Sequence, residues 1–243
     1  MKFKSIVHKT LQRFGYDLNK YPILPESLVR RRLFFKTMNF DAVFDVGANR
    51  GQFGEYLRHQ VQFKKKIFSF EPLSSAYAVL NAKAALDQNW VTYNFALGEH
   101  EEKKEINIAG NSYSSSFLKM LPVHEKAAPE SKFIDKEWVE VKTLDSITDD
   151  LTDFNKNIFL KIDTQGFERQ VLLGAKNKLQ FINTIQLEMS LLPLYNGEPI
   201  FEETYAFLNK LGYSLIDIEC GFTDPTTGKL LQVDGFFQRK HDL

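Results

Sequence analysis

A short apolar segment of this chain turns abruptly into a glycine-punctuated loop, and this feature constrains the fold more than any other. Residues 42–46 are typical of a strand and residues 52–62 of a helix. Gly47 and Gly51, in the loop between them, lack a Cβ, so the backbone can approach a bound ligand closely there. The following helix would present unpaired N–H groups to the same ligand. The segment therefore predicts a ligand site in an α/β fold.

The spacing within this loop disfavours a pyrophosphate ligand. Asp45, Gly47, Asn49 and Gly51 form the pattern Asp-x-Gly-x-Asn-x-Gly. This pattern differs from the Gly-x-Gly-x-x-Gly of dinucleotide-binding loops and lacks the lysine of a P-loop. A different kind of nucleotide ligand is expected.

An acidic residue follows the next predicted strand, at residues 66–70. Glu71 at this position could accept hydrogen bonds from both hydroxyls of a ribose. Asp45 lies near the place where an amino-acid group of the same ligand would be held. Together these features suggest an adenosine-type cofactor without a pyrophosphate, and S-adenosylmethionine (SAM) has that shape. The alternative is a glycine turn followed by a solvated glutamate.

Length and composition indicate one globular α/β domain. The chain has 243 residues, of which 43% are hydrophobic, which is enough for a sizeable core. It contains no apolar run long enough to span a membrane, and residues 1–10 do not have the pattern of a secretory signal. Cys220 is the only cysteine, so an internal disulfide is excluded. We expect a cytoplasmic protein.

Positive charge is concentrated at the N-terminus, although the net charge of the chain is zero. Residues 1–36 hold nine Lys or Arg against Asp17 and Glu26. Apolar residues recur at three- and four-residue steps up to Phe14, which predicts a basic amphipathic helix. This helix is expected to pack on the domain's own core, and contact with an anionic membrane surface is the alternative. Nucleic acid is not an expected partner, because no nucleic-acid-binding motif is present. We divide the chain into a basic helical arm, 1–38, and a domain, 39–243.

Strand-like and helix-like segments alternate through most of the domain, which predicts a mainly parallel sheet with helices on both faces. The last two strands lack a helix between them and are expected to form an antiparallel pair. The predicted strands are 42–46, 66–70, 91–95, 157–162, 183–189, 213–218 and 232–238, and the predicted helices are 52–62, 74–87, 166–180 and 200–211.

An insertion, at about residues 99–142, interrupts this alternation. It begins with a charge run, 99–105, that is expected to be solvated. A serine cluster at 111–116 and an irregular stretch follow, and residues 138–142 form a further predicted strand. A long insertion in a compact domain is often a functional lid. The serine cluster is therefore expected either to close over a substrate or to form a flexible polar loop.

Three carboxylates are expected near the cofactor. Asp163 follows a buried strand, Glu168 begins the next helix, and Glu188 ends the next strand. In an open α/β sheet the ligand crevice lies at the carboxyl ends of the strands. These acids could deprotonate a hydroxyl, bind sugar hydroxyls or hold a divalent cation such as Mg²⁺. The alternative for Glu168 is stabilisation of its own helix N-terminus.

Six segments, in order along roughly residues 40–240, resemble the FkbM-type SAM-dependent methyltransferases. The resemblance implies a class I methyltransferase fold: a seven-stranded, mostly parallel sheet with one antiparallel strand. It also implies methylation, usually at oxygen, of sugars, polyketides or cell-surface glycans. The segments are Val43–Gly54, Phe70–Pro72, Asn94–Gly98, Thr143–Asp145, Lys161–Glu168 and Leu187–Glu188.

The resemblance also implies roles for individual residues. The methionine part of SAM would be held by Asp45, Gly47, Asn49 and Gly51, and the ribose by Glu71. Asn94 and Ala96 would lie beside the adenine.

The expected mechanism is an in-line attack of an acceptor oxygen on the methyl group, with a protein base taking up the proton. Asp163 is the first candidate for this base, and His100 and His124 are alternatives. Tyr195, residues 196–198 and Phe222 are placed at the border of the acceptor pocket.

Other functional classes are less well supported by the sequence. A nicotinamide-dependent oxidoreductase would need a different glycine loop and a Tyr-x-x-x-Lys pair. A nucleic-acid amino-methyltransferase would need an Asn-Pro-Pro-aromatic motif. A protein that binds a cofactor or glycan without catalysis remains an alternative.

Overall fold

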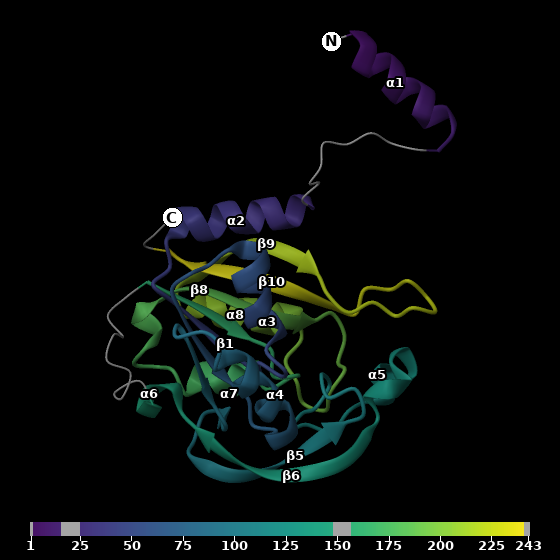
Figure 1. The fold of residues 1–243 in the computed structure, drawn as a ribbon. Helices are drawn as coiled ribbons and strands as arrows, with labels where there is room; N and C mark the ends of the chain where they lie inside the picture. The colour runs from purple at the N-terminus through teal and green to yellow at the C-terminus, as the bar shows by residue number, and fades with distance from the viewer. Residues whose placement is uncertain (1, 16–24, 148–156, 241–243) are drawn as a thin grey trace.

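A computed structural model describes residues 2–15, 25–147 and 157–240 (Figure 1). Its main sheet consists of seven strands: β1 (Ala42–Val46), β2 (Lys66–Phe70), β3 (Trp90–Tyr93), β7 (Ile158–Ile162), β8 (Ile182–Ser190), β9 (Tyr213–Cys220) and β10 (Gln232–Arg239). They are arranged in the order β3-β2-β1-β7-β8-β10-β9. In this sheet β10 alone runs in the direction opposite to the other six strands. The predicted class I methyltransferase fold, including the antiparallel final pair, is confirmed.

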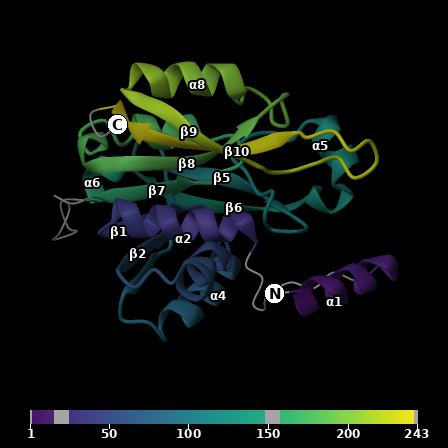
Figure 2. The ribbon, with the colours of Figure 1, turned by 90° about the horizontal axis from the view of Figure 1, so that it is seen from above.

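Helices cover both faces of the sheet. The first face carries α2 (Glu26–Met38), α3 (Gln52–Glu55), the π-helix η1 (Tyr56–Val61) and α4 (Ser74–Ala84). The second face carries helices that include α6 (Leu144–Ile147), α7 (Glu168–Leu173), the 3₁₀ helix η3 (Leu179–Phe181) and α8 (Phe201–Lys210). Figure 2 shows α2 and α4 on one side of the sheet and α8 on the other. Successive residues of a strand point to opposite faces, so Val43 and Phe159 pack under the helices of the first face, and Phe44 and Leu160 under those of the second.

Two predicted helices differ from the structure. The helix predicted at 52–62 is α-helical for one turn and continues as η1. The helix predicted at 166–180 ends as α7 at Leu173. The Asp145 carboxylate accepts hydrogen bonds from the backbone N–H groups of Asn177 and Lys178, both at 3.1 Å. These donors are therefore turned away from a continued helix.

The insertion is more regular than its sequence suggested. Its strands β4 (Ala96–Leu97), β5 (Glu102–Ala109) and β6 (Phe133–Lys142) form a second sheet in the order β4-β6-β5, and α5 (Pro122–Ala127) and the 3₁₀ helix η2 (Pro129–Ser131) connect β5 to β6. Residues 102–105 of the charge run therefore lie in a strand, and residues 100–103 are exposed to solvent as expected. Opposite charges pair across its outer face, such as Lys136 with Glu105 at 2.5 Å. On the inner face, Ile106 and Val139 are buried against Leu73 and Ala76.

The N-terminal region forms two helices. The predicted basic helix is present as α1 (Lys2–Arg13) and lies apart from the sheet in Figures 1 and 2, rather than packed on the core as expected. By contrast α2, whose residues we assigned to the basic arm, buries Leu28 and Phe35 against the first face of the sheet. In the described part of the chain, every helix is too short or too polar to cross a bilayer.

We predict that Phe35→Ala destabilises the whole sheet domain. The Phe35 ring lies 5.2 Å from that of Phe40 and 5.1 Å from that of Phe159, so truncation leaves a cavity next to β7. The free energy of unfolding, measured with urea, should fall by about 3–5 kcal/mol. Leu33→Ala on the same helix is the matched control, because Leu33 is 63% exposed. Its effect should stay within about 0.5 kcal/mol, and equal effects of the two variants would contradict a role of α2 in the domain core.

Candidate functional site

A cavity of about 250 Å³ opens at the carboxyl ends of β1, β2, β7 and β8. This is the edge of the sheet at which ligands bind in open α/β folds. Among the residues predicted for the site, those that line the cavity are Gly47, Asn49, Glu71, Ala96, Asp163 and Glu188. The remaining predicted residues, Asp45, Gly51, Asn94 and Glu168, lie behind this lining or beside it.

The loop after β1 adopts the strained backbone that its glycines predicted. Gly47 has φ 76°, Asn49 φ 46° and Gly51 φ 83°, all in the left-handed region. A Cβ on Gly47 would lie 1.8 Å from the carbonyl oxygen of Asp163. The loop can therefore cross the end of β7 only with glycine at this position.

Glu71 ties the end of β2 to this loop. Its Oε2 accepts the backbone N–H of Asn49 and its Oε1 that of Leu73, both at 2.8 Å. Burial raises the pKa of Glu71 to about 7, against the opposing effect of these two hydrogen bonds. The side-chain amide of Asn94 braces the same corner by donating to the carbonyl oxygens of Glu71 and Pro72 at 3.0 Å.

The wall beyond Glu71 is apolar. Ala96 lines it, together with Leu73, Ile106 and Phe117. Such a surface suits the flat face of an aromatic base.

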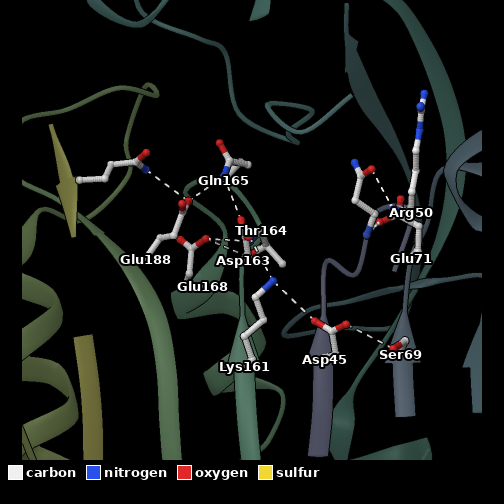
Figure 3. Close-up of polar contacts among 12 residues, drawn as sticks. Asp45, Arg50, Ser69, Glu71, Lys161, Asp163, Thr164, Gln165, Glu168 and Glu188 are labelled. Carbon is white, nitrogen blue, oxygen red and sulfur yellow. Dashed lines mark hydrogen bonds and ion pairs between the residues drawn. The ribbon is translucent and has the colours of Figure 1, made fainter. Parts of the chain in front are cut away.

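Asp45 does not reach the cavity. It is fully buried under the loop, where Ser69 Oγ donates to its Oδ2 at 3.3 Å. Its Oδ1 lies 3.5 Å from Lys161 Nζ, at ion-pair distance (Figure 3). Burial raises the pKa of Asp45 and the Lys161 charge opposes that shift. Ser69 and Lys161 are the direct register partners of Asp45 on β2 and β7, which explains why the three side chains share one face.

Lys161, for which no role was predicted, also contacts Asp163. Its Nζ donates to Asp163 Oδ2 at 3.1 Å. Burial lowers the pKa of Lys161, but the charges of Asp163 and Asp45 outweigh burial and raise it overall. The ammonium group is therefore held charged between two carboxylates.

Gln165 joins two of the predicted acids and was also missed as a site residue. Its Nε2 donates to Asp163 Oδ1 at 2.9 Å and to Glu188 Oε2 at 2.6 Å (Figure 3). Its Oε1 accepts from the Tyr195 hydroxyl at 2.9 Å. Gln165 has φ 55°, which is unusual for a residue other than glycine and is typical of functional sites.

Glu168 holds the turn that carries Gln165. Its Oε1 accepts from the backbone N–H of Thr164 at 2.9 Å, from the Thr164 hydroxyl at 3.1 Å and from the backbone N–H of Gly166 at 3.2 Å. Burial raises the pKa of Glu168 to about 7. This geometry agrees with the alternative in which Glu168 binds backbone donors at the start of its own helix.

Glu188 lines the cavity on the far side of Gln165 from Asp163. Burial and the charges of Asp163 and Asp234 raise its pKa well above the ordinary glutamate value. Gln232 Nε2 lies 3.4 Å from the same oxygen that Gln165 contacts.

The serine cluster of the insertion forms part of the cavity wall. Ser112, Tyr113 and Ser115 line it. The Ser112 hydroxyl lies 3.3 Å from the Asn49 amide, and Ser116 Oγ donates to the Gln165 carbonyl oxygen at 2.7 Å. The insertion therefore contacts both the loop after β1 and the turn after β7.

The two histidine candidates lie in different surroundings. The His100 side chain is 78% exposed. His124 is buried against Tyr195 and Phe222, and burial lowers its pKa to about 4, so it is neutral at pH 7. Neither residue lines the cavity described above.

Glu198 supports Tyr195 from behind. Its Oε1 accepts the backbone N–H groups of Leu194 and Tyr195, the latter at 3.0 Å.

Within the described residues, His, Cys, Asp and Glu side chains form no group arranged to hold a metal ion.

The sequence matches the family model of the methyltransferase FkbM domain over residues 45–215. The chain belongs to this family. The match extends from Asp45 on β1 into β9 and contains the whole cavity lining. No curated protein matches the sequence significantly.

Solved structures similar to this FkbM-family chain include three methyltransferases. Methyltransferase FkbM from Methylobacillus flagellatus has 13% identity and a TM-score of 0.46, with 81% of this chain and 44% of that chain covered. Magnesium protoporphyrin IX methyltransferase from Synechocystis, with bound SAM, has 9% identity and a TM-score of 0.46, with 88% and 77% covered. Precorrin-6y C5,15-methyltransferase from Geobacter metallireducens has 12% identity and a TM-score of 0.46, with 93% and 94% covered.

We predict that Glu168→Gln changes the pH dependence of stability. The folded-state pKa of Glu168, about 7, lies above its ordinary value of 4.5, so its stabilising contribution is complete below pH 4.5 and is lost as the pH rises through 7. Between these limits the wild type should lose up to about 3 kcal/mol of unfolding free energy relative to the variant. Urea unfolding at several pH values measures this difference. The exposed Glu202→Gln should run parallel to the wild type, and a parallel Glu168→Gln curve would contradict the prediction.

Proposed function

We propose that this chain is a SAM-dependent methyltransferase that methylates a hydroxyl group of a sugar, a glycan or another secondary metabolite. The observation that carries the proposal is one cavity with two different ends. The end formed by β2 and β1 has the apolar wall, the glycine loop and Glu71. The end formed by β7 and β8 has Asp163 and Glu188, joined through Gln165. Family membership supports methyl transfer as the reaction.

The residues of the first end fit SAM. Gly47 leaves room for a close approach to the backbone, and Glu71 keeps lone pairs for ribose hydroxyls beyond those used by Asn49 and Leu73. Ala96 and the apolar wall would hold the adenine. The cavity is slightly smaller than the roughly 300–1,000 Å³ typical of small-molecule sites. The long contact between Asn49 and Ser112 is therefore expected to open when the cofactor enters.

When bound, SAM supplies an electrophilic methyl group on a sulfonium sulfur. The protein's part is to hold the acceptor oxygen in line, to exclude water and to receive the hydroxyl proton. Asp163 and Glu188 are the acids in reach of an acceptor in the cavity. Glu168 contributes indirectly because it fixes the turn between them.

The charge of the second end favours a neutral, hydroxyl-bearing acceptor. Asp163, Glu188 and Asp234 gather there, and the ammonium group of Lys161 is already paired with carboxylates. A phosphate or carboxylate on the acceptor would be repelled at this end. This argues against a nucleic-acid substrate, although nucleic-acid methyltransferases share the fold.

We expect SAM and S-adenosylhomocysteine (SAH) to bind with micromolar dissociation constants, near −8 kcal/mol, and NAD not to bind. Calorimetric titration of the purified chain, with and without magnesium, measures this. Magnesium should make no difference, because the described His, Cys, Asp and Glu side chains form no group that could hold a metal ion. Glu71→Gln should weaken SAM binding at least tenfold by loosening the loop, whereas the exposed Glu101→Gln should not. Binding of NAD alone, or of no ligand, would overturn the cofactor assignment.

We expect Asp163→Asn to retain SAM binding and to lose most turnover. The substitution keeps the shape of the side chain but removes the charge that faces Lys161. Transfer of labelled methyl groups from SAM to a panel of methyl glycosides should fall roughly 100-fold or more. Unchanged turnover with unchanged binding would remove Asp163 from the mechanism. Binding without turnover in the wild type would favour a non-catalytic role or an acceptor outside the panel.

A further inference from the structure

Both carboxylate oxygens of Asp163 are already engaged by the protein. Oδ2 accepts from the Lys161 ammonium at 3.1 Å, and Oδ1 accepts from the Gln165 amide at 2.9 Å. The backbone N–H of Asp163 is fixed by the carbonyl oxygen of Val46 at 3.0 Å. Asp163 is therefore oriented on three sides, with each carboxylate oxygen already accepting one hydrogen bond from the protein.

Glu188 is engaged through one oxygen only. Its Oε2 accepts from Gln165 at 2.6 Å and, more weakly, from Gln232 at 3.4 Å. In the described part of the structure, Oε1 has no hydrogen-bond donor within reach, and the residue lines the cavity. One oxygen thus anchors the side chain while the other remains open to a ligand.

We propose, building on the proposed function, that Glu188 is the general base of the methyl transfer and that Asp163 and Gln165 are positioning residues. The acceptor oxygen forms a bond to the methyl carbon as the methyl–sulfur bond breaks. The electron pair of that bond stays on sulfur, which becomes the neutral thioether of SAH. The hydroxyl O–H bond breaks and its proton goes to Glu188 Oε1, so that charge and atoms balance.

The surroundings of Glu188 make its carboxylate a stronger base than an ordinary glutamate. Burial, Asp163 and Asp234 raise its pKa, and Lys161 acts in the opposite direction. Asp234 is its direct register partner on β10. The titratable and charged groups that face it from the surrounding elements are Lys161 of β7, Asp163 directly after β7, Glu168 of α7, Asp234 of β10 and Tyr195 of the loop after β8.

Gln165 supports this arrangement from a strained backbone. Its amide nitrogen donates to both acids, its amide oxygen accepts from the buried Tyr195, and its backbone oxygen accepts from Ser116. A left-handed conformation in a residue other than glycine persists only where contacts determine it this fully. Glu198 holds Tyr195 in turn, so the geometry of Glu188 depends on a line of contacts running away from the cavity.

Carboxyl ¹³C NMR of the full chain, labelled in Asp and Glu and saturated with SAH, tests the assignment without an acceptor. Glu188→Gln identifies the Glu188 signal and Asp163→Asn the Asp163 signal. Glu188 should titrate well above the ordinary glutamate value of about 4.3. Gln165→Leu should raise its midpoint further, because a donor to the carboxylate is lost, and Gln232→Leu should raise it less. A Glu188 midpoint near the ordinary glutamate value would overturn the proposal.

Turnover on the methyl glycoside panel gives a second readout. Glu188→Gln should lower kcat roughly 100-fold or more and abolish the rise of kcat with pH, and Glu188→Asp should restore part of both. Asp163→Asn should lower kcat but keep its rise with pH. If the rise with pH disappeared in Asp163→Asn and persisted in Glu188→Gln, the proposal would be overturned. The proposed function fails separately, if the wild type does not bind SAH. If the panel holds no substrate, the NMR titration still decides the assignment.

Discussion

The buried ammonium group of Lys161 is the interaction on which the site depends. It lies between Asp45, under the loop after β1, and Asp163, at the end of β7. Removing one partner of a buried ion pair typically costs about 3–5 kcal/mol, because the remaining charge is left uncompensated. The pairing therefore joins the loop after β1 to the acid end of the cavity. Asp45, which we expected at the methionine part of SAM, is buried outside the cavity lining and pairs with Lys161.

The turn after β7 connects Asp163 to Glu188 on the next strand, β8, through the Gln165 side chain. Glu168 collects three donors from residues 164–166, which leaves the Gln165 side chain facing Asp163 and Glu188. Two carboxylates that are both within hydrogen-bond distance of one nitrogen atom would repel one another without a donor between them. A single amide that donates to both reduces that repulsion. Glutamine serves here because its two N–H groups leave one nitrogen in different directions.

The fold could be predicted from the sequence because apolar strands, glycine turns and strand-end acids are local signals. Gly47 and Glu71 were found in this way, and both line the cavity. Gln165 could not be found, because its role depends on Glu188 and Tyr195, which are distant in sequence. The strand β5 was missed because its outward charges pair with those of β6, and a charged face resembles a loop when its partner strand is unknown. Lys161 was overlooked for a related reason, since only the register of β1 and β7 places it beside Asp45.

The serine segment of the insertion forms hydrogen bonds to both ends of the cavity. Ser112 contacts Asn49 at the proposed cofactor end, whereas Ser116 and the backbone of Ser114 contact Gln165 and Tyr195 at the acid end. A segment bonded to both ends links a change at one end to the other. Entry of the cofactor beside Asn49 would therefore also disturb the turn that positions Glu188. Under the proposed function, sequence changes in this serine segment would thus alter the acceptor end while every residue of the methyltransferase core stays the same.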